Sequence, residues 1–165
     1  MSDRSEKSSD MIERLQARVD QLESRMAIQT LAYDYCHGFD KRDFDRFLNI
    51  WWDDCVWNIG PPFGVFNGHG GIRDAVHNIL WPAWDESHHL TTNNVISFDS
   101  PDRARSICDV DCTGRLAGET VCQMVSATYA DTLERRDDVW RIQRRDVTIH
   151  YFNPVPGTTL VKPEA

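Results

Sequence analysis

Two neighbouring histidines, His88 and His89, lie at the head of the segment "ESHHLTTN", which has the pattern of a β-strand. Adjacent side chains on a strand point to opposite faces, so at most one of the two can face a given pocket. An imidazole titrates near neutral pH and can therefore remove a proton as a general base. The residue type alone leaves a second interpretation open, in which the histidine is a hydrogen-bonded structural residue.

A second residue that could do chemistry is Asp40, which follows a glycine in "HGFDKRD". Its carboxylate could serve a base, and it could equally cap a helix or form an ion pair. The sequence contains no nucleotide-binding glycine loop, no H-E-x-x-H and no nucleophile elbow. These absences argue against nucleotide-dependent enzymes, zinc proteases and serine hydrolases.

The segment "CDVDC" carries two further carboxylates, Asp109 and Asp111. Strand alternation places both on one face and Cys108, Val110 and Cys112 on the other. If the apolar face lines a pocket, the two aspartates point outward. The cysteine spacing matches no metal motif, so we expect small buried side chains there.

Composition limits the partners and the compartment. The formal charge of −8 over 165 residues argues against nucleic acid or an anionic membrane as a partner. The first ten residues, "MSDRSEKSSD", are too polar for a signal peptide or a membrane span. Five cysteines, an odd number, fit reduced thiols. We therefore expect a cytoplasmic protein.

The elements that must position these residues begin with a helix. We expect residues 1–10 to be disordered and a helix to follow, ending near Gly38. Its apolar residues recur at steps of three and four: Ile12, Leu15, Val19, Leu22 and Met26. Two heptads are too short for an isolated coiled coil, so this helix should pack on its own domain or on a neighbouring subunit.

A second helix is predicted in "DFDRFLNIWW", with Asp43 as its N-cap. A short strand, "CVWNI", and a glycine- and proline-rich loop, "PPFGVFNGHGG", follow. A third helix should cover residues 72–80 and end at "WPAW".

From His88 onward the hydrophobic period changes from 3.6 to 2. Four long strands are predicted, separated by the hairpin-type turns "SPD", "AGE" and "RDD". Helices followed by an antiparallel meander indicate an α+β fold with helices on one face of a curved sheet. We expect one domain over residues 11–153 and a proline-rich tail, 154–165, that loops out.

Three blocks, "GFDKRDFDRFLNIWWDDCVW", "ESHHLTTN" and "ERRDDVWRIQRRD…YFNP", resemble the SnoaL-like, scytalone-dehydratase-like family. The resemblance covers roughly residues 26–154 and is nearest to hexachlorocyclohexane dehydrochlorinase and the bile-acid dehydratases. It implies the cone-shaped nuclear-transport-factor-like fold, an antiparallel α+β barrel capped by N-terminal helices. It also implies a homotrimer that binds a hydrophobic small molecule.

The resemblance assigns catalytic roles to residues of this chain. It implies a dyad in which Asp40 orients His89, so that His89 faces into the cone and His88 faces away. Arg145 would hold a developing negative charge. The substrate-binding residues would be Trp57 and Tyr129, with an apolar lining that alternation extends to Val110, Cys112, Val147 and Ile149.

The chain departs from the dehydrochlorinase pattern at Tyr35, where such an enzyme can carry a lysine. A phenol can give a proton to a leaving hydroxyl, whereas chloride needs none. This favours a cofactor-independent, metal-free dehydratase that acts on a steroid-, bile-acid- or polyketide-like cyclic hydroxy-ketone.

Three alternatives remain open. A dehydrochlorinase would use the same dyad but release chloride from a chlorinated cyclohexane. A ketosteroid isomerase or polyketide cyclase would leave the mass of the substrate unchanged. The non-catalytic small subunit of a ring-hydroxylating dioxygenase would need no aligned dyad at all.

Overall fold

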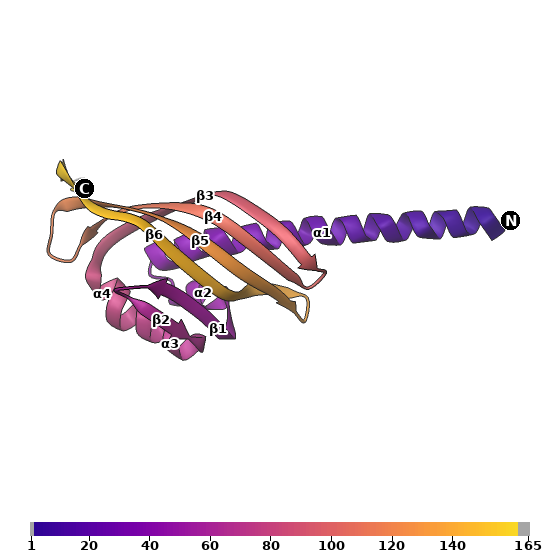
Figure 1. Cartoon of the computed structure of the whole chain (residues 1–165), viewed down its shortest axis with the longest axis horizontal. Coiled ribbons are helices and arrows are strands. Elements are labelled where there is room, and N and C mark those ends of the chain that lie inside the picture. The colour runs from indigo at the N-terminus through magenta and orange to yellow at the C-terminus, as the bar shows by residue number, and fades with distance from the viewer. Residues whose placement is uncertain (1, 162–165) are drawn as a thin grey trace.

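Helices precede a long sheet along the chain, as the change of hydrophobic period predicts (Figure 1). The computed structural model describes residues 2–161. Its helices are α1 (Ser2–Asp40), α2 (Phe44–Asn49), α3 (Gly68–Asp74), the π-helical segment η1 (Ala75–Leu80) and α4 (Trp81–Ala83). Its strands are β1 (Trp51–Gly60), β2 (Gly64–Asn67), β3 (Trp84–Ser100), β4 (Arg103–Leu116), β5 (Val121–Arg136) and β6 (Val139–Thr159). The predicted α+β class is confirmed.

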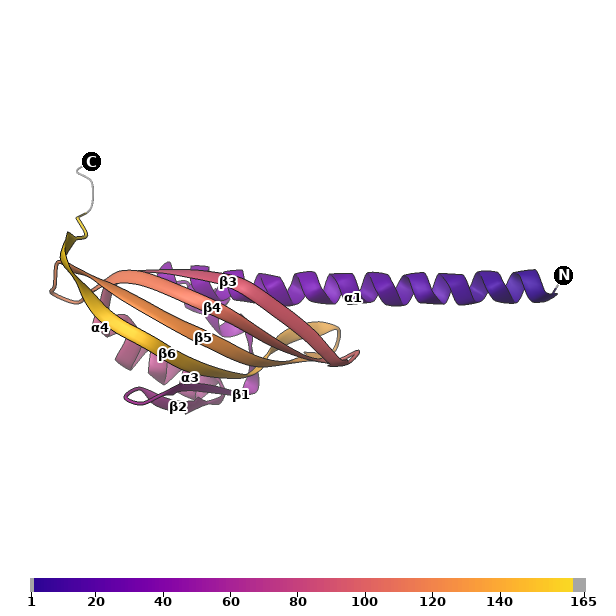
Figure 2. The ribbon, with the colours of Figure 1, turned by 45° about the horizontal axis from the view of Figure 1, so that its top comes forward.

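The six strands form one curved sheet in the order β2-β1-β6-β5-β4-β3 (Figure 2). Strands β3 to β6 make the predicted antiparallel meander, whereas β1 pairs with β6 in parallel. The edge strands β2 and β3 do not pair, so the cone is open rather than a closed barrel. Helix α1 packs against β3 and β6. The concave face of the sheet therefore faces the helices.

Helix α1 continues past Gly38, where we predicted its end. A Cβ atom at this position would lie 2.7 Å from the backbone nitrogen of Phe47. The glycine therefore permits the close approach of α1 and α2. The helix ends at Asp40, and α2 then begins with the predicted cap, because Asp43 Oδ1 accepts a hydrogen bond from the backbone N–H of Arg46 at 3.1 Å.

The N-terminal segment also differs from the prediction. Residues 2–10, expected to be disordered, are the first turns of α1. The sequence contains no glycine or proline before Gly38, so nothing interrupts a helix that the domain holds further along. Met1 lies outside the described residues.

Two segments predicted as loops pair with the sheet. Residues 64–67 of the glycine-rich loop form β2, and the helical segment that follows begins at Gly68 rather than at Ile72. At the other end of the chain, residues 154–159 extend β6 along β5. Prolines are tolerated there because β1 pairs with β6 only between Ile142 and Asp146, which leaves the other side of the strand open. Residues 162–165 of the predicted tail lie outside the described part of the chain.

The core lies between α1, α2 and the concave face of the sheet. Its largest fully buried side chains include Trp51, Trp57, Phe47 and Ile28. In the part of the chain that the structure describes, no helix has both the length and the apolar character needed to cross a bilayer.

Candidate active site

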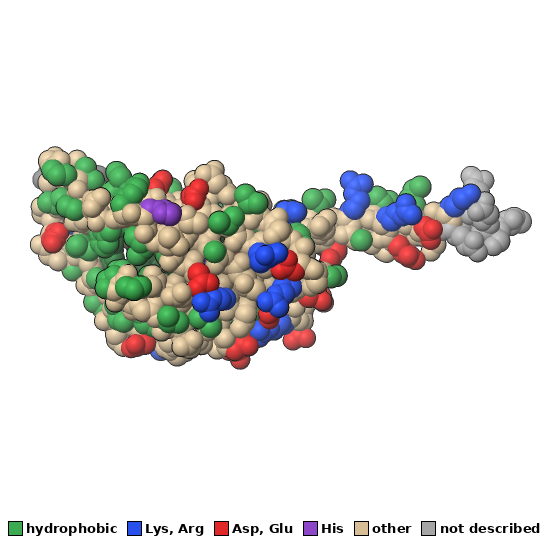
Figure 3. Space-filling view, in the orientation of Figure 1, with side chains coloured by type: hydrophobic (Ala, Val, Ile, Leu, Met, Phe, Trp, Pro, Cys, Tyr) green, Lys and Arg blue, Asp and Glu red, His purple; other side chains and the backbone are tan. Residues whose placement is uncertain are grey.

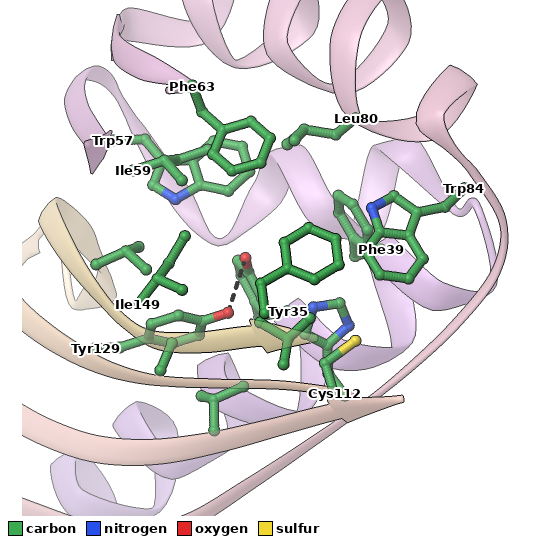
Figure 4. Close-up of a pocket in the computed structure, with 16 residues that line it drawn as sticks. Tyr35, Phe39, Trp57, Ile59, Phe63, Leu80, Trp84, Cys112, Tyr129 and Ile149 are labelled. Atoms are coloured by element: carbon green, nitrogen blue, oxygen red, sulfur yellow. Dashed lines mark hydrogen bonds between the residues drawn. The ribbon is translucent and has the colours of Figure 1, made fainter. Parts of the chain in front are cut away.

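An apolar pocket opens between the helices and the concave face of the sheet (Figure 4). Most of its wall is aliphatic or aromatic, and the polar groups that reach it are a histidine, a thiol, two indoles and two phenols. The lining residues are Tyr35, Phe39, Trp57, Ile59, Phe63, Leu80, Trp84, His89, Val110, Cys112, Val125, Ala127, Tyr129, Val147, Ile149 and Phe152. Such a pocket favours a hydrophobic ligand with few polar groups.

The register of the sheet explains why these side chains meet. His89 pairs with Cys112, Cys112 with Val125, and Val125 with Phe152, which makes one row across β3, β4, β5 and β6. Residues paired across neighbouring strands share a face of the sheet. The whole row therefore points into the pocket, although its members lie up to 63 positions apart in sequence (from 89 to 152).

His89 and Asp40 form the centre of the site. The Nδ1 atom of His89 lies 2.6 Å from Asp40 Oδ1, and the backbone N–H of His89 donates to Oδ2 at 2.7 Å. Their side chains are 13% and 7% exposed. Phe39 and Tyr35 flank the imidazole edge-on, with ring centroids 5.3 and 5.9 Å away. The ring is therefore fixed in position, and Nε2 is not used by the dyad.

The dyad changes the protonation of both members. Burial favours the neutral form of His89, but its hydrogen bonds, above all to Asp40, outweigh this and raise its pKa to about 10. Burial opposes ionisation of Asp40 as well, yet the hydrogen bonds it accepts from His89 and Ser87 hold its pKa below the ordinary value. Asp40 is thus an anion, and His89 is a stronger base than a free imidazole.

Ser87 also hydrogen-bonds to Asp40, and the sequence analysis did not predict it as a site residue. Its hydroxyl donates to Asp40 Oδ1 at 2.8 Å, so the carboxylate accepts three hydrogen bonds. Strand alternation could have predicted this residue, because Ser87 and His89 are two positions apart and therefore lie on the same face of β3.

Two buried phenols meet at the floor of the pocket. The hydroxyl of Tyr129 donates to that of Tyr35 at 3.3 Å (Figure 4). Burial raises the pKa of both phenols well above the ordinary value, so both are neutral. Among residues 7–161, the hydroxyl of Tyr35 has no acceptor for its own proton. That proton is available to a polar group in the pocket.

Arg145 lies one layer behind these phenols and does not line the pocket. Its guanidinium carbon is 4.4 Å from the ring centroid of Tyr35 and 4.3 Å from that of Tyr129. The resemblance implies that this cation holds a developing negative charge. In the structure the rings of Tyr35 and Tyr129 cover it, so its charge reaches the pocket through them.

Asp131 is the partner of Arg145, and the sequence analysis missed it. Its two carboxylate oxygens accept from Arg145 Nε at 2.8 Å and Nη2 at 2.7 Å. The two residues are direct neighbours across β5 and β6. Asp131 is also two residues from Tyr129, so alternation places it on the inner face.

Replacing Asp131 with asparagine should destabilise the fold by about 3–5 kcal/mol, because it leaves the buried guanidinium uncompensated. Urea unfolding followed by tryptophan fluorescence measures this change. The control is Asp111→Asn, which alters an exposed carboxylate on β4 and should stay within about 0.5 kcal/mol of wild type. Equal effects of the two substitutions would show that the buried pair does not stabilise the fold.

The remaining predicted residues fall on two sides of the sheet. Trp57, Val110, Cys112, Val147 and Ile149 all line the pocket. His88, Asp109 and Asp111 are exposed on the other side. His88 Nε2 lies 3.2 Å from Glu86 Oε1. Only one of the two histidines therefore faces the pocket, as alternation requires.

Among the described residues, no three or more His, Cys, Asp or Glu side chains are grouped to hold a metal ion. The five cysteines are free thiols. The polar side chains that line the pocket are those of His89, Cys112, the phenols Tyr35 and Tyr129, and the indoles Trp57 and Trp84.

Comparison with known proteins identifies close relatives. Residues 20–146 match the family model of the SnoaL-like domain. The chain is 38% identical over 147 residues to hexachlorocyclohexane dehydrochlorinase 1 of Sphingobium indicum. The alignment covers 89% of this chain and 95% of that protein. It is 37% identical over 145 residues to gamma-hexachlorocyclohexane dehydrochlorinase of the same species, covering 88% and 92%.

Solved structures agree with these matches. The crystal structure of LinA, at 37% identity, superposes with a TM-score of 0.85 and covers 89% of this chain and 99% of its own. A scytalone dehydratase-like protein from Novosphingobium aromaticivorans, at 20% identity, superposes with a TM-score of 0.76 and covers 86% and 94%. The second likeness shows a shared fold only.

Proposed function

The chain belongs to the SnoaL-like family, and on that premise we propose that it is a lyase that eliminates hydrogen chloride from a chlorinated cyclohexane. The sequence alone favoured loss of water. The dehydrochlorinases among the relatives support the alternative that the sequence left open, namely chloride as the leaving group.

One observation carries the proposal: the His89–Asp40 dyad, joined at 2.6 Å, at the wall of an apolar pocket. An elimination needs a base beside a C–H bond and a dry cavity for a hydrophobic ring. The ionised Asp40 accepts the proton on Nδ1 of His89, so the neutral ring has an unprotonated Nε2.

In the proposed reaction, Nε2 of His89 removes a proton from one ring carbon. The electrons of that C–H bond form the carbon–carbon double bond, and the adjacent C–Cl bond breaks with its electron pair on chloride. Asp40 stabilises the imidazolium that results, as the acid of a catalytic triad does. A base in this position contributes about 10²- to 10⁴-fold in rate.

The phenol pair is the proposed site for the departing anion. The hydroxyl of Tyr35 can donate to chloride, and the charge of Arg145 behind both rings favours negative charge in front of them. The aliphatic residues of β4, β5 and β6 would hold the ring by apolar contact.

The direct test is a panel of substrates containing hexachlorocyclohexane, a hydroxylated 3-keto steroid and a scytalone-like ketone. Chloride in solution and product mass are measured for each. We expect loss of HCl from hexachlorocyclohexane. Loss of water without chloride would replace this proposal with the dehydratase, and an unchanged mass in turnover would indicate an isomerase or cyclase.

The activity should rise with pH through an inflection above 6.5, the ordinary pKa of a histidine. The reason is that only neutral His89 can take a proton, while Asp40 raises its pKa. As pH falls below the raised pKa of His89, the imidazole becomes protonated. For a single essential base, kcat/KM should then fall about tenfold per pH unit. A kcat/KM profile that is flat from pH 6 to 9 would argue against His89 as the base.

A second function, dehydration, is favoured by the phenol pair, because Tyr35 could protonate a leaving hydroxyl. On a hydroxylated substrate, Tyr35→Phe should slow loss of water by roughly 10²-fold or more, since a general acid is lost. Chloride release should fall much less, because chloride leaves without a proton. Both rates are measured on the same enzyme preparation.

The matched control for this substitution is Tyr33→Phe, which removes an exposed hydroxyl from the same helix. It should leave both rates unchanged. If Tyr35→Phe also leaves both rates unchanged, Tyr35 has only a packing role.

A further inference from the structure

The N-terminal part of α1 carries a row of apolar side chains that stay exposed in the described chain. The exposed fractions are 51% for Leu15 and Val19 and 60% for Leu22. Figures 1 and 2 show this part of α1 extending beyond the sheet, and Figure 3 shows apolar and charged side chains along it. We define the N-terminal seam as Ile12, Leu15, Val19, Leu22 and Met26.

The seam lies opposite the face of α1 that packs on the sheet. On the packed face, Asp20 pairs with Arg135 at 2.6 Å and Ser24 is buried. Because each residue turns a helix by about 100°, Leu22 lies about 160° around α1 from Ser24. The chain's own sheet therefore cannot cover the seam, and an exposed apolar stripe of this kind marks an interaction surface.

We propose that the N-terminal seam pairs with the same seam of a second copy of this chain, as a parallel two-stranded coiled coil. The spacing assigns Ile12 and Val19 to heptad position a, and Leu15 and Leu22 to position d. β-Branched residues at a with leucine at d favour two parallel strands.

The charges beside the seam also select this partner and this direction. Arg18 falls at heptad position g and Glu23 at position e. In a parallel pair, g of one helix faces e of the next heptad in the other, so Arg18 meets the partner copy's glutamate twice by symmetry. An antiparallel pair would bring like charges together. Among the side chains that the structure describes, residues 7–161, neither Arg18 nor Glu23 forms a side-chain hydrogen bond or an ion pair.

The short length of the seam is offset by the way α1 is held. Isolated helices of two heptads are marginal because forming the first turn is costly. Here α1 is one helix from Ser2 to Asp40, and the domain holds it from Asp20 onward. The first turn of helix is therefore already formed before the two copies meet.

Disulfide trapping of the full-length protein tests the proposal. Leu15→Cys places a thiol at position d, where two in-register helices come within disulfide reach. Arg14→Cys places one a residue away on the outer face. Under mild oxidation and non-reducing electrophoresis, Leu15→Cys should form a covalent pair and Arg14→Cys should remain at the wild-type background.

A charge exchange tests the direction. Arg18→Glu and Glu23→Arg should each slow trapping of the Leu15→Cys protein, and the two together should restore it. Trapping at background for Leu15→Cys, or equal trapping for Arg14→Cys, would overturn the proposal. So would trapping of Leu15→Cys only with Leu22→Cys, the antiparallel result. A trimer by light scattering with no trapping would mean that copies meet elsewhere, as in the homotrimer that the resemblance implies, and not through the seam.

Discussion

Replacing His89 with glutamine should lower kcat on the chlorinated ring by about 10²- to 10⁴-fold, the contribution of a positioned general base. Glutamine keeps an NH₂ group that can donate a hydrogen bond to Asp40, but its amide cannot accept a proton from carbon. The fold should persist, because the wall around residue 89 is formed by other side chains of α1, β4 and β5. Single-turnover kinetics measure the loss, and circular dichroism checks the fold.

The matched control is His88→Gln, one position away on the outer side of the same strand. Its side chain is 51% exposed and faces Glu86 instead of the pocket. It should keep wild-type kcat. An active, folded His89→Gln protein, or equal losses for the two variants, would remove His89 as the base.

Asp40→Asn should reduce kcat/KM by roughly 10³-fold, within the range expected when the partner of a catalytic histidine is lost. The carboxylate accepts three hydrogen bonds, from Ser87, from His89 Nδ1 and from the His89 backbone. An asparagine has one acceptor oxygen and a donating NH₂ group, so one of these donors must lose its partner. The imidazole would then turn or change tautomer.

The pH profile separates positioning from a merely structural role. Without the anion beside it, the pKa of His89 should fall, so the rising limb of kcat/KM should move to lower pH. Ser87→Ala removes one hydrogen bond and should cost at most about tenfold. A loss of rate in Asp40→Asn with no shift of the limb would show that Asp40 supports the fold and does not tune the base.

The wall of the pocket on β3 and β4 could be predicted from the sequence because strand periodicity is simple. A period of two fixes which of His88 and His89 shares a face with Ser87, and the same rule sends Val110 and Cys112 inward. The short turns then set the pairing, which aligns His89 with Cys112. On β3 and β4, therefore, strand alternation and the pairing of the two strands place the same side chains in the pocket.

Contacts between distant elements could not be predicted in the same way. Glycine is common at helix ends, so Gly38 was predicted to end α1. In the structure it lets α2 approach α1, and this role depends on the position of Phe47, which the sequence does not give. Arg145 alternates onto the inner face, yet whether it reaches the pocket depends on the bulk of Tyr35 and Tyr129 in front of it. Whether an inward-facing side chain reaches the pocket depends on the side chains packed in front of it. Strand alternation predicts only the face of the sheet on which it lies.

The leaving group also could not be predicted from the sequence. Tyr35 favours water when the residue is considered alone, because a phenol can act as an acid. In the structure the same phenol is neutral, buried and backed by Arg145, an arrangement that suits an anion equally well. The residue type therefore did not decide the reaction, and the relatives favour chloride.

The proposed reaction is an elimination in which His89 removes a proton from carbon, and hexachlorocyclohexane with every hydrogen replaced by deuterium distinguishes it from hydrolysis. We expect one deuterium to be lost to solvent for each chloride released, and chloride release to be slower than from the undeuterated ring. Release of chloride with all deuterium retained and a hydroxyl in place of chlorine would show hydrolysis and would rule out elimination.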